Sequence, residues 1–407
     1  KPAVEKALEL SLKEINEIAN QKDTANFENT IGKMERSGEV LNRVYPFYGI
    51  YSNNLSSPKF QKIQTELAPK ISDYSNKIYQ NNKLFERIKK VFTDSKNKPL
   101  DSIDQRLIDL TYKRFIMNGA ELDSIKKLKY ADINNELSTL YTKFSNNILS
   151  DEENYTTFLS ENELSGLSES FINTIKNESI RLGKNDKFAI SNTRSSMDPF
   201  LKFSENRNLR KQVWENYYSR ADNNDEYDNK SIIEKILKLR KERVNILGYD
   251  YYPEWRLQDR MAKSPENALK LLLDIWPSSI KTVEKEVDEM QKIADKDNVT
   301  IEPWDYRFYA EKVRNEKYDY DSEEVKSYLQ LENLKDAMFF VAKEIFNLEF
   351  KEIEHGKVPV FHQDVSVWEV YDIDENKLIG LWYLDPFSRP GKRSGAWATT
   401  YRSYGSF

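Results

Sequence analysis

The sequence contains no cysteine among its 407 residues. This absence excludes disulfide bonds, thiol nucleophiles and cysteine-ligated metal sites. Histidine is scarce too, since His355 and His362 are the only two. They lie seven positions apart, so the His-Glu-x-x-His pattern, which puts two imidazoles one helical turn apart on zinc, does not occur. The sequence also has no phosphate-binding Gly-x-x-x-x-Gly-Lys loop and no Gly-x-Ser-x-Gly nucleophile turn. We therefore assign no catalytic residue and no metal ligand.

An excess of charge of one sign is also missing, because 62 basic residues nearly balance 67 acidic ones. No broad field therefore attracts nucleic acid, and we expect no nucleic-acid partner. No apolar run approaches the roughly 20 residues that cross a bilayer, so we expect a soluble chain with no membrane partner. Because the sequence begins with Lys1, a removed export signal stays possible. Localisation is unknown, and the cytoplasm and the periplasm both remain open.

Helical periodicity dominates the first part of the sequence. Apolar residues recur every three to four positions, as in Val4, Leu8, Leu12 and Ile15, which is the spacing of one buried helix face. Similar patterns continue to about Glu153. These segments predict a helical scaffold.

The middle of the sequence combines loose and regular stretches. Between Asp151 and Pro199 the periodicity weakens, which predicts a connection with one short strand at Lys187 to Ile190 and turns from Ser191 to Pro199. Helices are predicted from Asn206 to Ala221 and from Asn229 to Leu247. A further helix begins at Ser264-Pro265, with Ser264 as its cap. The residues predicted for its buried side are Leu269, Leu272, Leu273 and Trp276.

The segment from Pro303 to Arg314 packs aromatic and charged residues together, which favours an aromatic core flanked by ion pairs. A strongly apolar helix face follows, formed by Leu331, Leu334, Met338, Val341, Ile345 and Leu348. After Phe350 the period changes to two, which predicts strands around Val358 to Val360, Val365 to Val367 and Leu378 to Leu384. The turn of the resulting hairpin is predicted at Asp374 to Lys377.

The predicted fold is therefore mainly α, a large multi-helix body with a small β-hairpin or sheet near the C-terminus. We divide it into an N-terminal helical region at 1–153, a central helical region at 154–350 and the start of an α+β region at 351–407.

The stretch from Leu378 to Thr400 concentrates special backbone residues, charge and aromatic side chains. It predicts a strand, a basic loop containing Gly391 and Gly395, and a second strand at Ala396 to Ala398. Glycines in such a loop can leave a strand edge open to a peptide, or they can simply turn the chain.

The stretch also carries a family resemblance. Its residues, with shorter matches in the same order along the whole chain, resemble the thimet oligopeptidase family of zinc metallopeptidases, above all its bacterial peptidyl-dipeptidase (Dcp) branch. The matching residues are Phe361-His362-Gln363-Asp364-Val365, Leu384 to Trp397, Phe27-Glu28-Asn29-Thr30-Ile31, Met34 to Gly38, Leu137-Ser138, Lys143-Phe144-Ser145, Leu247-Gly248-Tyr249, Met261-Ala262, Trp304-Asp305, Tyr309 and Arg314.

The resemblance implies a mostly helical channel fold that admits short peptides, and a small sheet beside a zinc-binding helix. It implies a substrate-binding role for Ser394, Gly395 and Ala396. Family members continue to a His-Glu-x-x-His helix that this sequence lacks. We therefore expect zinc in the complete family enzyme but none bound to this chain, and no peptidase activity from this chain alone.

Besides short peptides, we expect one of two further binding partners. A helical body that packs against a missing C-terminal part should expose apolar surface, so that part, or self-association, is a predicted partner. The alternative function is a non-catalytic, shortened relative that acts as a helical peptide- or protein-binding module. The gene sequence downstream of Phe407 discriminates between a fragment and such a relative.

Overall fold

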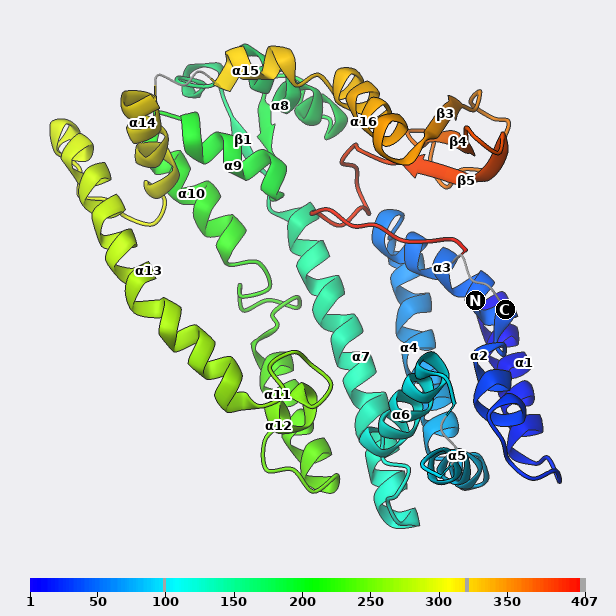
Figure 1. Cartoon of the computed structure of the whole chain (residues 1–407). Coiled ribbons are helices and arrows are strands. Elements are labelled where there is room, and N and C mark those ends of the chain that lie inside the picture. Colours follow the sequence, from blue (N-terminus) through cyan, green and yellow to red (C-terminus); the bar gives the residue numbers. More distant parts are fainter. Residues whose placement is uncertain (98–99, 319–321, 403–407) are drawn as a thin grey trace. The chain divides into compact units, whose positions relative to one another are not determined.

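The computed structural model describes residues 1–97, 100–318 and 322–402, and its fold is mainly α with two small antiparallel sheets, as predicted (Figure 1). The chain forms two compact units. The first contains Lys1–Asn154, Ser219–Thr282 and Gly395–Phe407, and the second contains Tyr155–Tyr218 and Val283–Ser394. The regions 1–153, 154–350 and 351–407 remain a prediction. Within the described residues, no helix is both long and apolar enough to span a membrane.

The first unit is built from helices. Its elements are α1 (Pro2–Ala19), η1 (Glu28–Gly32), α2 (Lys33–Glu35), α3 (Glu39–Asn54), α4 (Pro58–Tyr79), α5 (Asn82–Ser95), α6 (Ser102–Met117), α7 (Ser124–Asn154), α11 (Lys230–Ile246), α12 (Tyr252–Leu257) and the first part of α13 (Pro265–Ala294). The core between α1, α5 and α6 contains Ile15, Ile18, Leu84, Ile88 and Phe115. Helix α7 packs against both α4 and α11. The predicted helical scaffold is thus confirmed.

The second unit combines helices with both sheets. Its elements are β1 (Thr157–Leu159), η2 (Glu161–Glu163), α8 (Glu169–Arg181), β2 (Phe188–Ile190), α9 (Arg194–Phe203), α10 (Arg207–Tyr218), the rest of α13, η3 (Asp295–Asp297), α14 (Tyr306–Tyr318), α15 (Ser322–Tyr328), α16 (Leu331–Phe346), β3 (Leu348–Glu352), β4 (Ser366–Asp372) and β5 (Lys377–Leu384).

The connection predicted between Asp151 and Pro199 is more ordered than expected. The short strand is confirmed as β2, which pairs with β1 in an antiparallel ladder. Helix α8 was missed, although Ser168 caps it by accepting a hydrogen bond from the N–H of Phe171 at 3.4 Å. The predicted turns from Ser191 to Pro199 are wrong in part, because α9 begins at Arg194 and includes Pro199.

Helix boundaries with clear cap residues agree with the prediction. Ser264 Oγ accepts a hydrogen bond from the N–H of Asn267 at 3.3 Å, which caps α13. Gly248, at φ 88°, follows α11 in the left-handed conformation that glycine adopts most readily. The helices predicted at 206–221 and 229–247 are α10 and α11.

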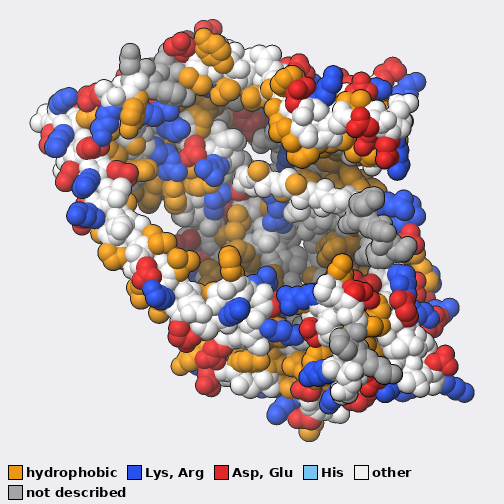
Figure 2. Space-filling model, viewed as in Figure 1, with side chains coloured by type: hydrophobic (Ala, Val, Ile, Leu, Met, Phe, Trp, Pro, Cys, Tyr) orange, Lys and Arg blue, Asp and Glu red, His pale blue; other side chains and the backbone are white. Residues whose placement is uncertain are grey.

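The apolar face predicted as the buried side of α13 is instead exposed. Leu272, Leu273 and Trp276 expose 63%, 59% and 64% of their surface. Leu334, Met338 and Val341 of α16 are exposed as well. Hydrophobic side chains accordingly reach the surface along α13 in Figure 2. The periodicity correctly indicated an apolar face, but within the described residues nothing buries it.

The larger sheet has the order β3-β4-β5, and β4 and β5 form the predicted hairpin. Asn376 in its turn has a positive φ of 46°, which asparagine tolerates better than most residues. The strand predicted around Val358 to Val360 is wrong, because these residues lie in the loop between β3 and β4. Leu348 begins β3 rather than extending the helix face.

Candidate functional site

The edge strand β5 is the first feature of the candidate site. It pairs with β4 along one side, with Trp382 opposite Trp368 and Leu381 opposite Glu369. Among the described residues, no strand pairs with its other side. An edge strand of this kind presents backbone N–H and C=O groups to an incoming strand. Leu378 and Ile379, exposed by 48% and 53%, add apolar surface beside that edge.

The loop that follows β5 is fixed by an ion cluster around Asp385. Arg389 donates two parallel hydrogen bonds to this carboxylate at 2.7 and 2.8 Å, and Lys392 Nζ lies 3.2 Å from it. Lys392 also donates to the carbonyl oxygens of Asp385 and Phe387. The three charged side chains expose 11% or less.

Two opposing effects act on the pKa of Asp385. Burial raises it, but the hydrogen bonds from Arg389 and Lys392 outweigh burial and lower the pKa below its usual value. The carboxylate therefore stays charged at neutral pH. Because Arg389 and Lys392 serve this internal contact, their charges stabilise the loop rather than a surface for anions.

The predicted substrate-binding residues Ser394, Gly395 and Ala396 come directly after this loop. All three are exposed, and Gly395 has a φ of 107°. Apart from its chain neighbours, no atom of the described residues lies within 4 Å of the position a Cβ would take. The second strand predicted at Ala396 to Ala398 is wrong, since these residues are irregular. A strand forms only when another strand satisfies its hydrogen bonds, and the described residues supply none here. The role of the three residues stays a prediction.

The two histidines lie in the loop between β3 and β4. His355 Nε2 is 3.2 Å from the carbonyl oxygen of Gln363, and His362 Nδ1 accepts a hydrogen bond from the N–H of Asp364 at 3.2 Å. Within residues 1–97, 100–318 and 322–402, no three His, Asp or Glu side chains gather to hold a metal ion. These residues do not fit a catalytic zinc, and no step through a metal is derived for them.

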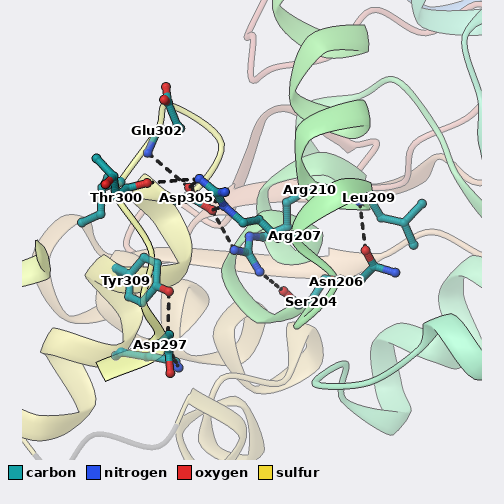
Figure 3. A network of polar contacts seen from close by, with 12 residues as sticks. Ser204, Asn206, Arg207, Leu209, Arg210, Asp297, Thr300, Glu302, Asp305 and Tyr309 are labelled. Atoms are coloured by element: carbon teal, nitrogen blue, oxygen red, sulfur yellow. Dashed lines mark hydrogen bonds and ion pairs between the residues drawn. The ribbon is translucent and has the colours of Figure 1, made fainter. Parts of the chain in front are cut away.

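A second polar network surrounds Asp305, just before α14 (Figure 3). Its carboxylate is completely buried and accepts hydrogen bonds from Arg207 Nη2 at 2.8 Å and Arg210 Nη2 at 2.7 Å. The backbone N–H of Glu302 donates to it at 3.2 Å. Arg210 also donates to the carbonyl oxygen of Ser204 at 2.8 Å. The network joins α10 to the segment that begins α14.

The residues around Asp305 confirm the predicted aromatic core flanked by ion pairs. The Arg210 guanidinium lies over the Phe308 ring, 4.1 Å from its centroid. Burial and a hydrogen bond to Asp297 raise the pKa of Tyr309 to about 12, so this hydroxyl remains a donor at neutral pH. We assign the network to the stability of the second unit. The partners Arg207 and Arg210 were not predicted, because nothing in the sequence marks a contact across nearly 100 positions.

The fold is that of a mainly helical protein with a small sheet, and among the described residues strand β5 of this sheet pairs on one side only. Residues 200–405, which include β5 and the following loop, match the model of peptidase family M3. The chain belongs to that family, and the resemblance to the thimet oligopeptidase group of zinc metallopeptidases is confirmed.

Curated relatives match nearly the entire chain. It is 31% identical to dipeptidyl carboxypeptidase of Escherichia coli strain K12, over 98% of this chain and 58% of that protein. It is 27% identical to oligopeptidase A of the same strain, over 97% of this chain and 59% of the relative. Saccharolysin of Saccharomyces cerevisiae is 28% identical, over 93% of this chain and 56% of that protein. The chain thus spans about three fifths of the length of these relatives.

Proposed function

We propose that the protein to which this chain belongs hydrolyses short peptides, as a peptidyl-dipeptidase or oligopeptidase. Membership of peptidase family M3 supports a peptidase, and the names of the relatives support cleavage of dipeptides from, or within, short chains. In this proposal the chain of 407 residues supplies part of the substrate-binding wall. Zinc, in the complete enzyme, would lower the pKa of a bound water for attack on the peptide bond.

One observation carries the substrate-binding role: β5 is an edge strand, and its loop is pinned by Asp385 before the chain reaches Ser394, Gly395 and Ala396. An extended peptide gains affinity from main-chain hydrogen bonds to such a segment. The open space beside Gly395 allows a peptide backbone to approach closely. A loop held by buried ion pairs loses little conformational entropy when the peptide binds.

The first experiment tests activity. The sequence contains no His-Glu-x-x-His pattern, so we expect chain 1–407 to cleave no fluorogenic peptide when zinc is added. The measurement is the rate of fluorescence increase with and without a chelator. Turnover that the chelator abolishes would overturn the assignment of the metal site to residues outside this chain.

The second experiment tests substrate binding by fluorescence anisotropy with a labelled short peptide. We expect Gly395→Ala to weaken binding at least about fivefold, about 1 kcal/mol, because alanine disfavours a φ of 107° and its methyl group occupies the open space. Gly356→Ala is the matched control, since Gly356 also has a positive φ, 89°, and a Cβ added there would meet no atom of the described part of the chain within 4 Å beyond its chain neighbours. Equal weakening by the two variants would refute the role of Gly395.

A further inference from the structure

The first unit contains a polar pocket of ≈290 Å³ between α4, α7 and α11. Hydroxyl and amide side chains dominate its wall, including Ser75, Asn76, Tyr79 and Asn134, and Arg243 is the one cationic side chain among the described residues that line it. None of the described lining residues is an aspartate or a glutamate. An anionic group in the pocket would therefore meet a cation and several neutral hydrogen-bonding groups, without repulsion from a lining carboxylate.

Arg243 has no carboxylate as an ion-pair partner among the described residues. Its buried Nε makes no hydrogen bond to any of them. One guanidinium nitrogen donates to Asn134 Oδ1 at 3.2 Å, and the group lies over the Trp255 ring at 4.8 Å. By contrast Arg240, one turn earlier on α11, donates to the hydroxyl of Tyr141 at 2.8 Å and does not line the pocket.

The guanidinium is held in place by a chain of side-chain amides. Asn134 receives the hydrogen bond from Arg243 and donates through Nδ2 to Asn76 Oδ1 at 2.8 Å. Asn76 is 6% exposed and donates to the carbonyl oxygen of Ala131 at 3.3 Å. Because these amides have fixed partners, the guanidinium is oriented before a ligand arrives, which reduces the entropy cost of binding.

We propose that this pocket binds a small molecule with a free carboxylate, of the size of an amino acid or a dipeptide, and that Arg243 holds the carboxylate. A guanidinium matches a carboxylate through two parallel N–H bonds. The volume lies near the lower end for small-molecule sites. The pocket is larger than a bare inorganic anion needs, and the hydroxyl groups of Ser75 and Tyr79 in its wall add hydrogen-bonding groups that an amino acid or dipeptide backbone can use.

Isothermal titration calorimetry of chain 1–407 with alanylalanine tests the proposal. We expect measurable binding, and at least about tenfold weaker binding of the C-terminal amide of the same dipeptide, which lacks the negative charge. Arg243→Gln should weaken dipeptide binding at least about tenfold, or 1.4 kcal/mol. Lys241→Gln is the matched control, because it removes the same charge from an exposed position on the same helix and should leave the affinity unchanged.

Three outcomes would overturn the proposal. They are equal binding of the dipeptide and its amide, unchanged binding by Arg243→Gln, and phosphate binding as tight as that of the dipeptide, which would indicate an inorganic anion site. Since Arg243 also packs on Trp255, its variant could unfold locally, so Ser75→Leu provides a second test. This change puts a larger apolar side chain into the pocket and leaves Arg243 in the sequence, and it should abolish binding while the melting temperature stays unchanged.

Retained dipeptide affinity in Ser75→Leu would also overturn the proposal. The pocket does not depend on the peptidase assignment, and a cross-test separates the two. Gly395→Ala should leave dipeptide binding to the pocket unchanged, and Arg243→Gln should leave anisotropy binding of the longer peptide unchanged. Loss of dipeptide binding in Gly395→Ala would place the dipeptide at the substrate segment instead.

Discussion

Asp305 is the residue whose charge most directly supports the second unit. Its buried carboxylate forms ion pairs with both Arg207 and Arg210, and Arg210 is itself only 2% exposed. We expect Asp305→Asn to lower the free energy of unfolding by about 3–5 kcal/mol, because it leaves a buried guanidinium without a counter-charge. Urea denaturation measures the loss.

The control for this change is Glu316→Gln on α14. Glu316 forms an ion pair with Lys296, and both side chains are mostly exposed, at 58% and 67%. Pairs of this kind contribute about 0–1 kcal/mol. Similar losses in Asp305→Asn and Glu316→Gln would show that the buried network has no special importance.

The same carboxylate makes stability depend on pH. Burial raises the pKa of Asp305, but the hydrogen bonds from Arg207 and Arg210 outweigh burial and lower it below 3.8. A depressed carboxyl pKa stabilises the folded state above the unfolded-state pKa, and the gain is lost as the pH falls through the folded-state pKa. The stability difference between the wild type and Asp305→Asn should therefore be constant from pH 7 to about 5 and shrink below about 4. Urea midpoints at several pH values test this, and a constant difference down to pH 2.5 would contradict it.

At the scale of single residues, the sequence did not predict which side chains contact one another. The segment around Asp305 was recognised as aromatic and charged, and its ion pairs were expected. Arg207, Arg210 and Arg243 were not singled out, because an arginine in a helical pattern gives no sign of whether it meets solvent, a carboxylate or a pocket. Only the packing of α10 or α11 against distant segments decides that.

Among the elements, α16 is joined to the sheet through Phe339. Its ring stacks on Phe350 with centroids 4.3 Å apart and meets Trp382 edge-on at 5.7 Å. We expect Phe339→Ala to lower the free energy of unfolding by about 2 kcal/mol, since it removes this aromatic contact from a partly buried position. The neighbouring Phe340 is 63% exposed, so Phe340→Ala should cost far less. Equal costs in a thermal or urea melt would show that α16 does not depend on Phe339.

The sequence predicted whether a segment is a helix or a strand more reliably than it predicted what packs against that segment. Periodicity identified α1, α10 and α11, and the change to period two identified the β4–β5 hairpin. The buried side assigned to α13 and the strand at Ala396 to Ala398 were wrong for a shared reason. An apolar helix face is buried only when another segment packs against it, and an extended segment becomes a strand only when another strand pairs with it. The residue pattern of one segment does not show whether such a partner exists.

At the scale of the molecule, the family could be recognised from short matches spread along the sequence, because they keep their order from Phe27 to Trp397. The candidate substrate segment could be placed after β5, but its geometry could not. The roles of Gly395 and of the ion cluster at Asp385 can be recognised only once the loop conformation is known. Since the chain spans about three fifths of its relatives, the activity of the whole protein rests on the proposal above.

The exposed apolar faces of α13 and α16 predict how the isolated chain behaves in solution. Residues such as Leu272, Trp276 and Phe346, exposed by 63%, 64% and 67%, lie on long helices where several apolar side chains follow one another. Exposed apolar surface of this extent commonly drives association. We expect chain 1–407 to bind a hydrophobic dye and to self-associate at micromolar concentration in sedimentation velocity experiments.

The double change Leu272→Lys and Trp276→Lys tests whether α13 is responsible. It should reduce both dye fluorescence and the associated fraction, because two charges interrupt the apolar face. Ile125→Lys is the control, since Ile125 is 82% exposed at the start of α7, away from these faces in the sequence, and its replacement should change neither measurement. A monodisperse monomer that binds no dye would contradict the prediction, and equal effects of the two variants would exclude α13 as the association surface.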